Sequence, residues 1–169
     1  MNYQIKNLIT LYMEICENSR IWIYQSDREL TEQELRTIQS HLDEFTASWA
    51  AHGNSLHAKG EIRFQRFIIM AVDEQKTGAS GCSIDKSVAL MQQLEIQLGI
   101  QLFDRMQIAY RDEAAIKTFR KADFNMLIEK GILNEHTVIF NNLIQRYGEL
   151  DTAWEIPLKE SWLNRLMPA

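Results

Sequence analysis

The stretch GEIRFQRFIIMAV, residues 60–72, decides the fold. Apolar and charged side chains alternate in its first half, so that Ile62 and Phe64 share one side of a strand and charged residues share the other. Its second half is apolar without interruption over residues 67–72, as expected of a strand that is buried on both faces. Two strands joined this closely form a β-hairpin. The stretch therefore predicts an edge strand followed by a central strand.

A second strand and a helix are predicted upstream of this hairpin. RIWIYQ, residues 20–25, contains four consecutive apolar residues rich in strand formers. Thr31 and Glu34 have the spacing of a helix capping box. Apolar residues then recur at spacings of three and four, which predicts an amphipathic helix: Leu35, Ile38, Leu42, Phe45 and Trp49. Gly53 is placed to end that helix in a left-handed conformation.

The downstream segments complete a regular order of elements. Ser83 is the predicted N-cap of a second helix that ends at Gly99, and RMQIAYR, residues 105–111, alternates like a strand. Strand, helix, strand, strand, helix, strand predicts an α+β protein with a ferredoxin-like βαββαβ antiparallel sheet. In that topology the two unbroken apolar strands are central, and the two alternating strands are edges. A three-layer α/β protein is the alternative, but it requires a more regular alternation of strands and helices.

This pattern divides the chain into three segments. Residues 1–18 are expected to form an N-terminal helical extension, residues 19–113 the ferredoxin-like core, and residues 114–169 a C-terminal extension packed on the core. Both central strands are also apolar on the face that the helices leave open. We expect the N-terminal helix, the C-terminal extension or a second subunit to cover that face, which allows a homodimer or a protein partner there.

Composition limits the function classes. The 169 residues are 46% hydrophobic and 24% charged, with a formal net charge of -5, and this negative balance disfavours non-specific nucleic-acid binding. No apolar run approaches the roughly 18 residues of a membrane span, and no signal peptide is expected. The two distant cysteines, Cys16 and Cys82, resemble neither a disulfide framework nor paired zinc ligands. We therefore expect no metal, no cofactor, no membrane or nucleic-acid partner, and a cytoplasmic location.

TGASGCSID, residues 77–85, is the candidate site. In the predicted topology this loop lies at the same end of the sheet as the end of the first helix and the end of the last strand. Cys82, His52 and Arg111 would then converge. A cysteine at a helix N-terminus has a lowered thiol pKa, and a nearby histidine can act as its base. Cys82 and His52 are therefore the candidate catalytic residues.

The same loop could instead hold an anion, because free N–H groups before a helix bind phosphate. The candidate ligand-binding residues are Gly78, Ser80, Gly81, Ser83, Lys86 and Arg111. A P-loop is not formed, since the spacing from Gly81 to Lys86 is one residue short and Asp85 stands where glycine is required. No ATPase activity is therefore predicted. The structural interpretation of the loop is a tight turn at Gly78 and Gly81, with Ser83 or Asp85 as the helix cap.

Four segments carry a resemblance to a known family: RIWIYQSDREL, AHGNSLHAKGEIRFQRFIIMAVDEQKTGASGCSIDKSV, FDRMQIAYRD and FNNLI. Together they are similar to an uncharacterised bacterial family over about residues 19–165, and GASGCSIDKSV is the most specific part. Members of that family often carry the label "ABC transporter ATPase". The resemblance implies no activity and no catalytic residue, and the residues of this chain do not support the ATPase label.

Two functions are consistent with the sequence. The first is a non-catalytic cytoplasmic binding or interaction protein. The alternative is a small enzyme or a ligand or anion sensor that uses the Gly78–Asp85 loop with Cys82. A flat apolar patch would favour the first function, and a deep pocket that holds Cys82, His52 and Arg111 would favour the second.

Overall fold

The structure is a computed structural model that describes residues 15–167. Its first sheet contains three antiparallel strands in the order β1-β5-β4, with bounds Arg20–Gln25 for β1, His57–Arg63 for β4 and Phe67–Asp73 for β5. The central strand β5 is buried at six of its seven residues, which confirms its predicted central position. The edge position of β4 is also confirmed.

Two helices cover one face of this sheet, α2 (Glu32–Ser48) and α3 (Gly81–Leu98). The capping box of Thr31 and Glu34 is present at the start of α2. At the end of α3, Gly99 adopts the left-handed conformation, and its N–H donates to the Glu95 carbonyl. Both of these predictions are confirmed.

Gly53 does not end α2, so that prediction is wrong. The helix stops at Ser48 with Trp49 in an extended conformation. Gly53, at φ +81°, lies instead in the turn between the short strands β2 (Ala50–Ala51) and β3 (Asn54–Ser55). The indole of Trp49 is almost fully buried, and its burial ends the helix earlier than a search for glycine suggests.

The second sheet is antiparallel with the order β7-β6-β8-β9. Its strands are β6 (Gln107–Asp112), β7 (Ala115–Arg120), β8 (Val138–Phe140) and β9 (Glu155–Pro157). Between them lie α4 (Phe124–Glu129) and α5 (Glu149–Thr152), with 3-10 turns at Lys121–Asp123, Leu158–Glu160 and Trp162–Leu166.

The position of β6 departs from the ferredoxin-like prediction. In that topology the fourth strand pairs with β1, whereas β6 pairs with β7 and β8. Ile108 and Tyr110 of β6 are buried against Phe119 and Ile139 of the second sheet, so the apolar face of β6 has a core of its own. The chain therefore follows the predicted order through α3 and then diverges. As a result β1 is an edge strand and not a central one.

The domain boundary predicted at residue 113 separates two paired strands, β6 and β7, so the second sheet begins earlier in the chain than expected. The predicted N-terminal helix falls largely on residues 1–14, which lie outside the described residues. Residues 15–19 form a turn in which the Ser19 N–H donates to the Cys16 carbonyl.

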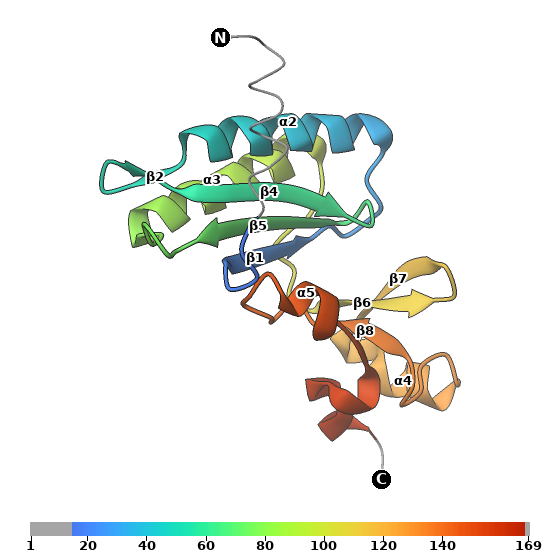
Figure 1. Ribbon diagram of the computed structural model, residues 1–169. Coiled ribbons are helices and arrows are strands. Elements are labelled where there is room, and N and C mark those ends of the chain that lie inside the picture. The colour runs from blue at the N-terminus through green and yellow to red at the C-terminus, as the bar shows by residue number, and fades with distance from the viewer. Residues whose placement is uncertain (1–14, 168–169) are drawn as a thin grey trace.

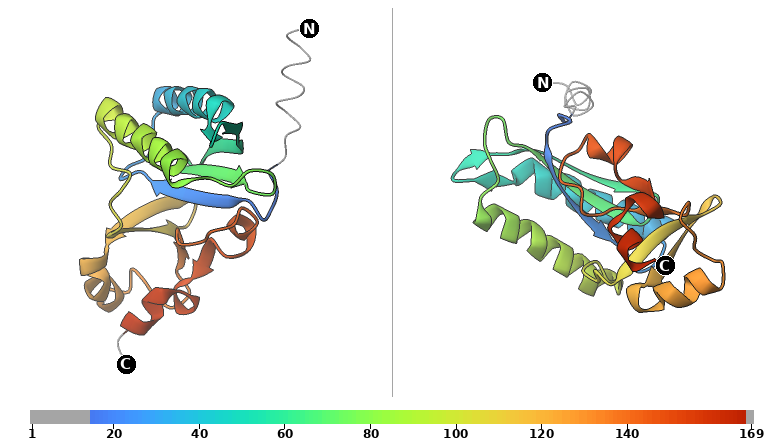
Figure 2. Two further views of the ribbon diagram at one scale, coloured as in Figure 1. Left: turned by 90° about the vertical axis from the view of Figure 1, so that its left-hand side faces the viewer. Right: turned by 90° about the horizontal axis from the view of Figure 1, so that it is seen from below.

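The C-terminal elements cover the helix-free face of the first sheet (Figure 2). Buried residues of β1 and β5 pack there against residues of the second half of the chain: Ile21, Phe67, Ile69, Ala71, Ala109, Phe140, Ile144, Leu150 and Trp154. The prediction that this face needs cover is confirmed. Because the chain itself supplies the cover, that face offers no surface for the homodimer or protein partner expected there.

Candidate functional site

The loop at residues 77–85 is a helix cap. Ser80 is the N-cap of α3. The Ser83 N–H donates to the Ser80 hydroxyl at 3.2 Å, and the Ser80 N–H donates to the Ser83 hydroxyl at 2.8 Å. The predicted caps, Ser83 and Asp85, are thus replaced by Ser80 with Ser83 as its reciprocal partner. These contacts use N–H groups that an anion would need.

A carboxylate also occupies the approach to this loop. Glu74 accepts a hydrogen bond from the Ala79 N–H at 3.2 Å and lies 3.8 Å from the Arg20 guanidinium. A negative group held there repels an incoming anion. The turn after β5 lies at residues 74–76, before the predicted glycines, and Gly81 is the first residue of α3.

The structure brings together only part of the predicted site. The Trp49 indole donates to the Ser83 carbonyl at 2.8 Å, so the end of α2 does meet the start of α3. His52 lies exposed in the β2–β3 turn, and Cys82 lies exposed in the first turn of α3. Arg111 does not join them.

Arg111 lies at the other end of β5. Its Nε and Nη2 donate to the Glu155 carboxylate at 2.7 and 2.9 Å, which raises the pKa of Arg111. Its guanidinium stacks 4.5 Å from the centre of the Phe64 ring, beside the turn that leads into β5. Arg111 therefore does not lie beside Cys82 and His52, the predicted catalytic residues. The predicted anion ligands are divided between two ends of the sheet.

A cavity of about 700 Å³ lies along β1, away from the residue 77–85 loop. We call it the β1 groove. Every residue of β1 lines it, together with residues of the loops before β6 and after β8. Those loop residues include Leu102, Phe103, Asp104, Arg105, Asn142, Leu143, Ile144, Gln145 and Arg146, and Gln107 at the start of β6 also lines the groove. The volume is within the range of about 300–1,000 Å³ that is typical of binding sites.

The free edge of β1 forms the floor of this groove. The Ile21 N–H donates to the Gln145 carbonyl at 3.0 Å, and the Ser19 carbonyl accepts from the Tyr147 N–H at 2.9 Å. Alternate residues of an antiparallel strand point their backbone groups to the same side, so those of Ile23 also point away from β5. Within residues 15–167, the Ile23 N–H and carbonyl have no backbone partner.

A chain of side-chain amides closes one end of the groove. The Trp154 indole donates to the Asn142 side-chain oxygen at 2.9 Å, and the Asn142 amide donates to the Gln25 side-chain oxygen at 2.9 Å. The Gln25 amide then donates to the Gln107 carbonyl at 3.3 Å. The Gln25 side chain thus connects β1 to β6. Direct backbone pairing of the two strands would close the space between them, so this side-chain contact keeps the groove open.

The walls of the groove present large apolar side chains among polar ones. On the helix side the ring of Tyr24 meets Phe103 edge-on, with 5.5 Å between centroids, and burial raises the pKa of the Tyr24 hydroxyl. Phe103 remains 39% exposed. On the other side Leu143 is 70% exposed. Large apolar side chains that line a groove and still contact water are typical of binding surfaces.

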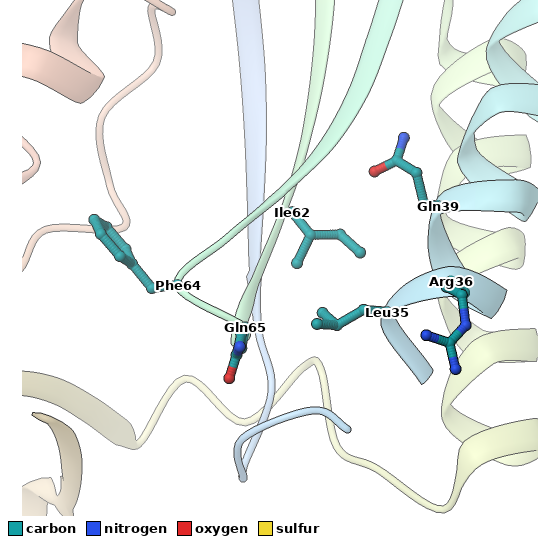
Figure 3. A pocket seen from close by; sticks show the side chains of 6 residues that line it. All are labelled: Leu35, Arg36, Gln39, Ile62, Phe64 and Gln65. Carbon is teal, nitrogen blue, oxygen red and sulfur yellow. The ribbon is translucent and has the colours of Figure 1, made fainter. Parts of the chain in front are cut away.

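A smaller hollow of about 410 Å³ lies between α2 and the β4–β5 turn, lined by Leu35, Arg36, Gln39, Ile62, Phe64 and Gln65 (Figure 3). Phe64 and Gln65 both have a φ of +52°. The Phe64 ring turns away from α2 and stacks on Trp154, with 5.6 Å between centroids. The strained turn thus serves the contact between the two halves of the chain.

Sequence reasoning missed the β1 groove. An unbroken apolar run such as that of β1 is expected both of a central strand and of a strand that lines a cavity. The alternation of apolar and polar residues in β6 does not show which strand β6 pairs with. One usable signal was present, because Leu143 follows two asparagines in a turn-forming segment where an apolar residue has no core to enter.

Two further observations bear on function. Within residues 15–167, no helix combines the length and apolarity needed to cross a membrane, and no cluster of three or more His, Cys, Asp or Glu residues is arranged to hold a metal ion. A scan against protein-family models, a search of curated proteins and a search of solved structures each found no match to this chain.

Proposed function

We propose that this protein is a non-catalytic binding protein that accepts an extended peptide segment along the free edge of β1. The observation that carries the proposal is the unpaired backbone of Ile23 on the floor of the β1 groove. An exposed strand edge offers N–H and carbonyl groups in a fixed register, and a peptide that pairs with them becomes an added strand.

The shape of the groove favours an extended ligand over a compact one. The cavity follows all six residues of β1, a length of about 20 Å at the rise of a β-strand. Side chains of an added strand would alternate between the two walls. One wall offers Phe103, and the other offers Ile144 and Leu143. The groove thus provides backbone pairing and apolar contacts on both sides of a strand.

The recess of this edge disfavours a second copy of the chain as the occupant. Pairing of β1 with the β1 of another copy would require two edges to meet, while each lies between the loops at residues 102–107 and 140–146. A single extended segment can enter such a slot, whereas the edge of a folded sheet cannot. The partner that we propose is therefore a peptide segment.

The alternative, a small enzyme or anion sensor built on the Gly78–Asp85 loop, has less support. Its residues do not share a cavity with Arg111, and Ser83 and Glu74 already bind its N–H groups. Membership of the bacterial family, the absence of ATPase activity and the cytoplasmic location stay predictions from the sequence.

A neutral hexapeptide of alternating threonine and valine, blocked at both ends, tests the proposal. Titration followed by nuclear magnetic resonance should shift the amides of Ile23 and Gln25 more than those of Trp22 and Tyr24. Two N-methylated versions give a matched control. Methylation of the residues that face β1 should abolish binding, and methylation of the alternate residues should not. Equal binding of both versions, or no binding at all, would contradict strand addition.

A further inference from the structure

We infer that the partner segment is acidic at its ends and apolar between them. This inference rests on the proposed function, because it specifies the peptide that the β1 groove accepts. It is carried by two arginines at opposite ends of the groove, by the carboxylates that are already paired there, and by the exposed apolar side chains between them.

The arginines flank the free edge of β1. Arg146 pairs with Arg20 in an isolated antiparallel bridge at the start of the strand. Arg105 lies in the loop before β6, which meets the other end of the strand through Phe103 on Tyr24 and Gln107 on Gln25. Both side chains are exposed, and both line the groove. A bound segment would therefore meet a positive group near each of its ends.

The carboxylates of the groove do not neutralise these two arginines. Glu74 lies beside Arg20 and also accepts from the Ala79 N–H. Asp104 lies 3.3 Å from Arg120 and accepts from the Met106 N–H at 2.9 Å. Among the ion pairs of residues 15–167, none joins a carboxylate to Arg105 or Arg146. The groove is thus locally positive in a chain whose formal net charge is -5.

The middle of the segment should be apolar. Between the two arginines the groove presents Phe103 and the largely exposed Leu143. Apolar side chains of the partner would remove this surface from water, which is favourable by about 25 cal/mol per Å². A carboxylate placed there would lose its hydration without a cation in reach. The recognised pattern is therefore an alternating apolar stretch bounded by Asp or Glu.

Three peptides test this pattern against the neutral threonine-valine core: the core alone, the core with glutamates at both ends, and the core with lysines at both ends. We expect the glutamate peptide to bind more tightly than the core by about two- to fivefold for each arginine, as exposed ion pairs contribute. The preference should weaken as salt screens the charges. Because the whole chain is negative, unspecific attraction would favour the lysine peptide instead, so the sign of the preference identifies a local site.

Charge reversal locates the effect. Arg105→Glu should abolish the preference between the glutamate and lysine peptides, because Arg146 at the other end is unchanged, while Arg36→Glu, an exposed change on α2 outside the groove, should leave it unchanged. Unfolding curves of both variants verify that they fold. Equal affinity for the three peptides would overturn this inference and leave strand addition standing. Failure of all three to bind, or sedimentation showing that a second copy fills the groove, would overturn both proposals.

Discussion

Glu34 shows how one side chain can organise the start of a helix. Its carboxylate accepts from Arg28 Nη1 and Nη2 at 2.9 and 2.7 Å and from the Thr31 N–H at 2.8 Å. The hydrogen bonds from Arg28, followed by that from the Thr31 backbone, lower the pKa of Glu34 from 4.5 to about 2. The same contacts join the loop after β1 to the first turn of α2.

This lowered pKa makes stability depend on pH in a defined window. A carboxylate with a lower pKa in the folded state stabilises the protein fully above its unfolded value, 4.5, and loses that contribution as pH falls to about 2. Glu34→Gln should therefore lower the melting temperature at neutral pH, and the difference from the native protein should shrink between these two pH values. Thermal unfolding across that range measures it. A difference that is constant with pH would contradict this assignment.

Ser80, Gly81 and Cys82 are neighbours with different predicted effects on stability. Ser80→Ala removes the N-cap of α3 and should cost about 0.5–2 kcal/mol. Gly81→Ala should be neutral or stabilising by up to about 1 kcal/mol, because Gly81 has no positive φ and an added Cβ would meet no atom within 4 Å. Cys82→Ser, at an exposed position, should change stability little. Urea unfolding of the three variants checks this order, and a destabilised Gly81→Ala would contradict it.

At the scale of the element, β1 combines the composition of a central strand with only one strand partner. All six of its residues lie opposite residues of β5. By the alternation of an antiparallel strand, the backbone groups of its even-numbered residues point toward β5 and those of Ile23 point into the groove. Proline lacks an N–H and is tolerated in a sheet only where that N–H faces away from the ladder. The two sides of β1 can therefore be distinguished by placing proline at adjacent positions.

Ile23→Pro should leave the protein folded and prevent peptide binding, whereas Trp22→Pro should unfold it, because the Trp22 N–H, unlike that of Ile23, faces Met70 in the β1–β5 ladder. Circular dichroism reports folding, and the peptide titration reports binding. Ile23→Val, which keeps the backbone donor, is the matched control and should bind normally. Normal binding by a folded Ile23→Pro protein would show that the free edge is not used.

The sequence predicts local elements well and their partners less well. The capping box at Thr31, the left-handed Gly99 and the buried run of β5 each depend on residues only a few positions apart. Such features can be predicted from the sequence. The partner of β6 depends on a competition between two surfaces, the edge of β1 and the apolar residues of β8. The free-energy difference between these two pairings does not appear in the pattern of apolar residues along the sequence. The groove that results from it was therefore not predictable. Likewise, the predicted site failed at Arg111, whose position depends on that same choice.

At the scale of the whole molecule, the two sheets are joined by an aromatic cluster. The rings of Phe64, Phe67, Phe140 and Trp154 lie 4.8–6.4 Å apart between centroids. Arg111 covers Phe64 and Phe140 while its guanidinium binds Glu155. The β4–β5 turn of the first sheet is thereby fixed to strands β6, β8 and β9.

Arg111→Lys tests the importance of this junction. Lysine keeps the charge but loses the bidentate contact and the planar stacking, so unfolding should become easier by about 1–2 kcal/mol. Arg105→Lys, at an exposed position without an ion pair among the described residues, is the matched control and should have little effect. Denaturant unfolding measures both variants. Equal effects of the two changes would show that the junction depends on charge alone.

The recess of β1 also has a consequence for the protein at high concentration. Ile21, Trp22, Ile23 and Tyr24 form an uncharged segment of strong strand formers without proline or glycine, a composition that favours cross-β fibrils when it is exposed. In the folded chain the loops on either side keep the sheet edges of other copies from this edge and leave room only for a single extended segment. The same walls that shape the groove therefore oppose edge-to-edge aggregation of the folded protein.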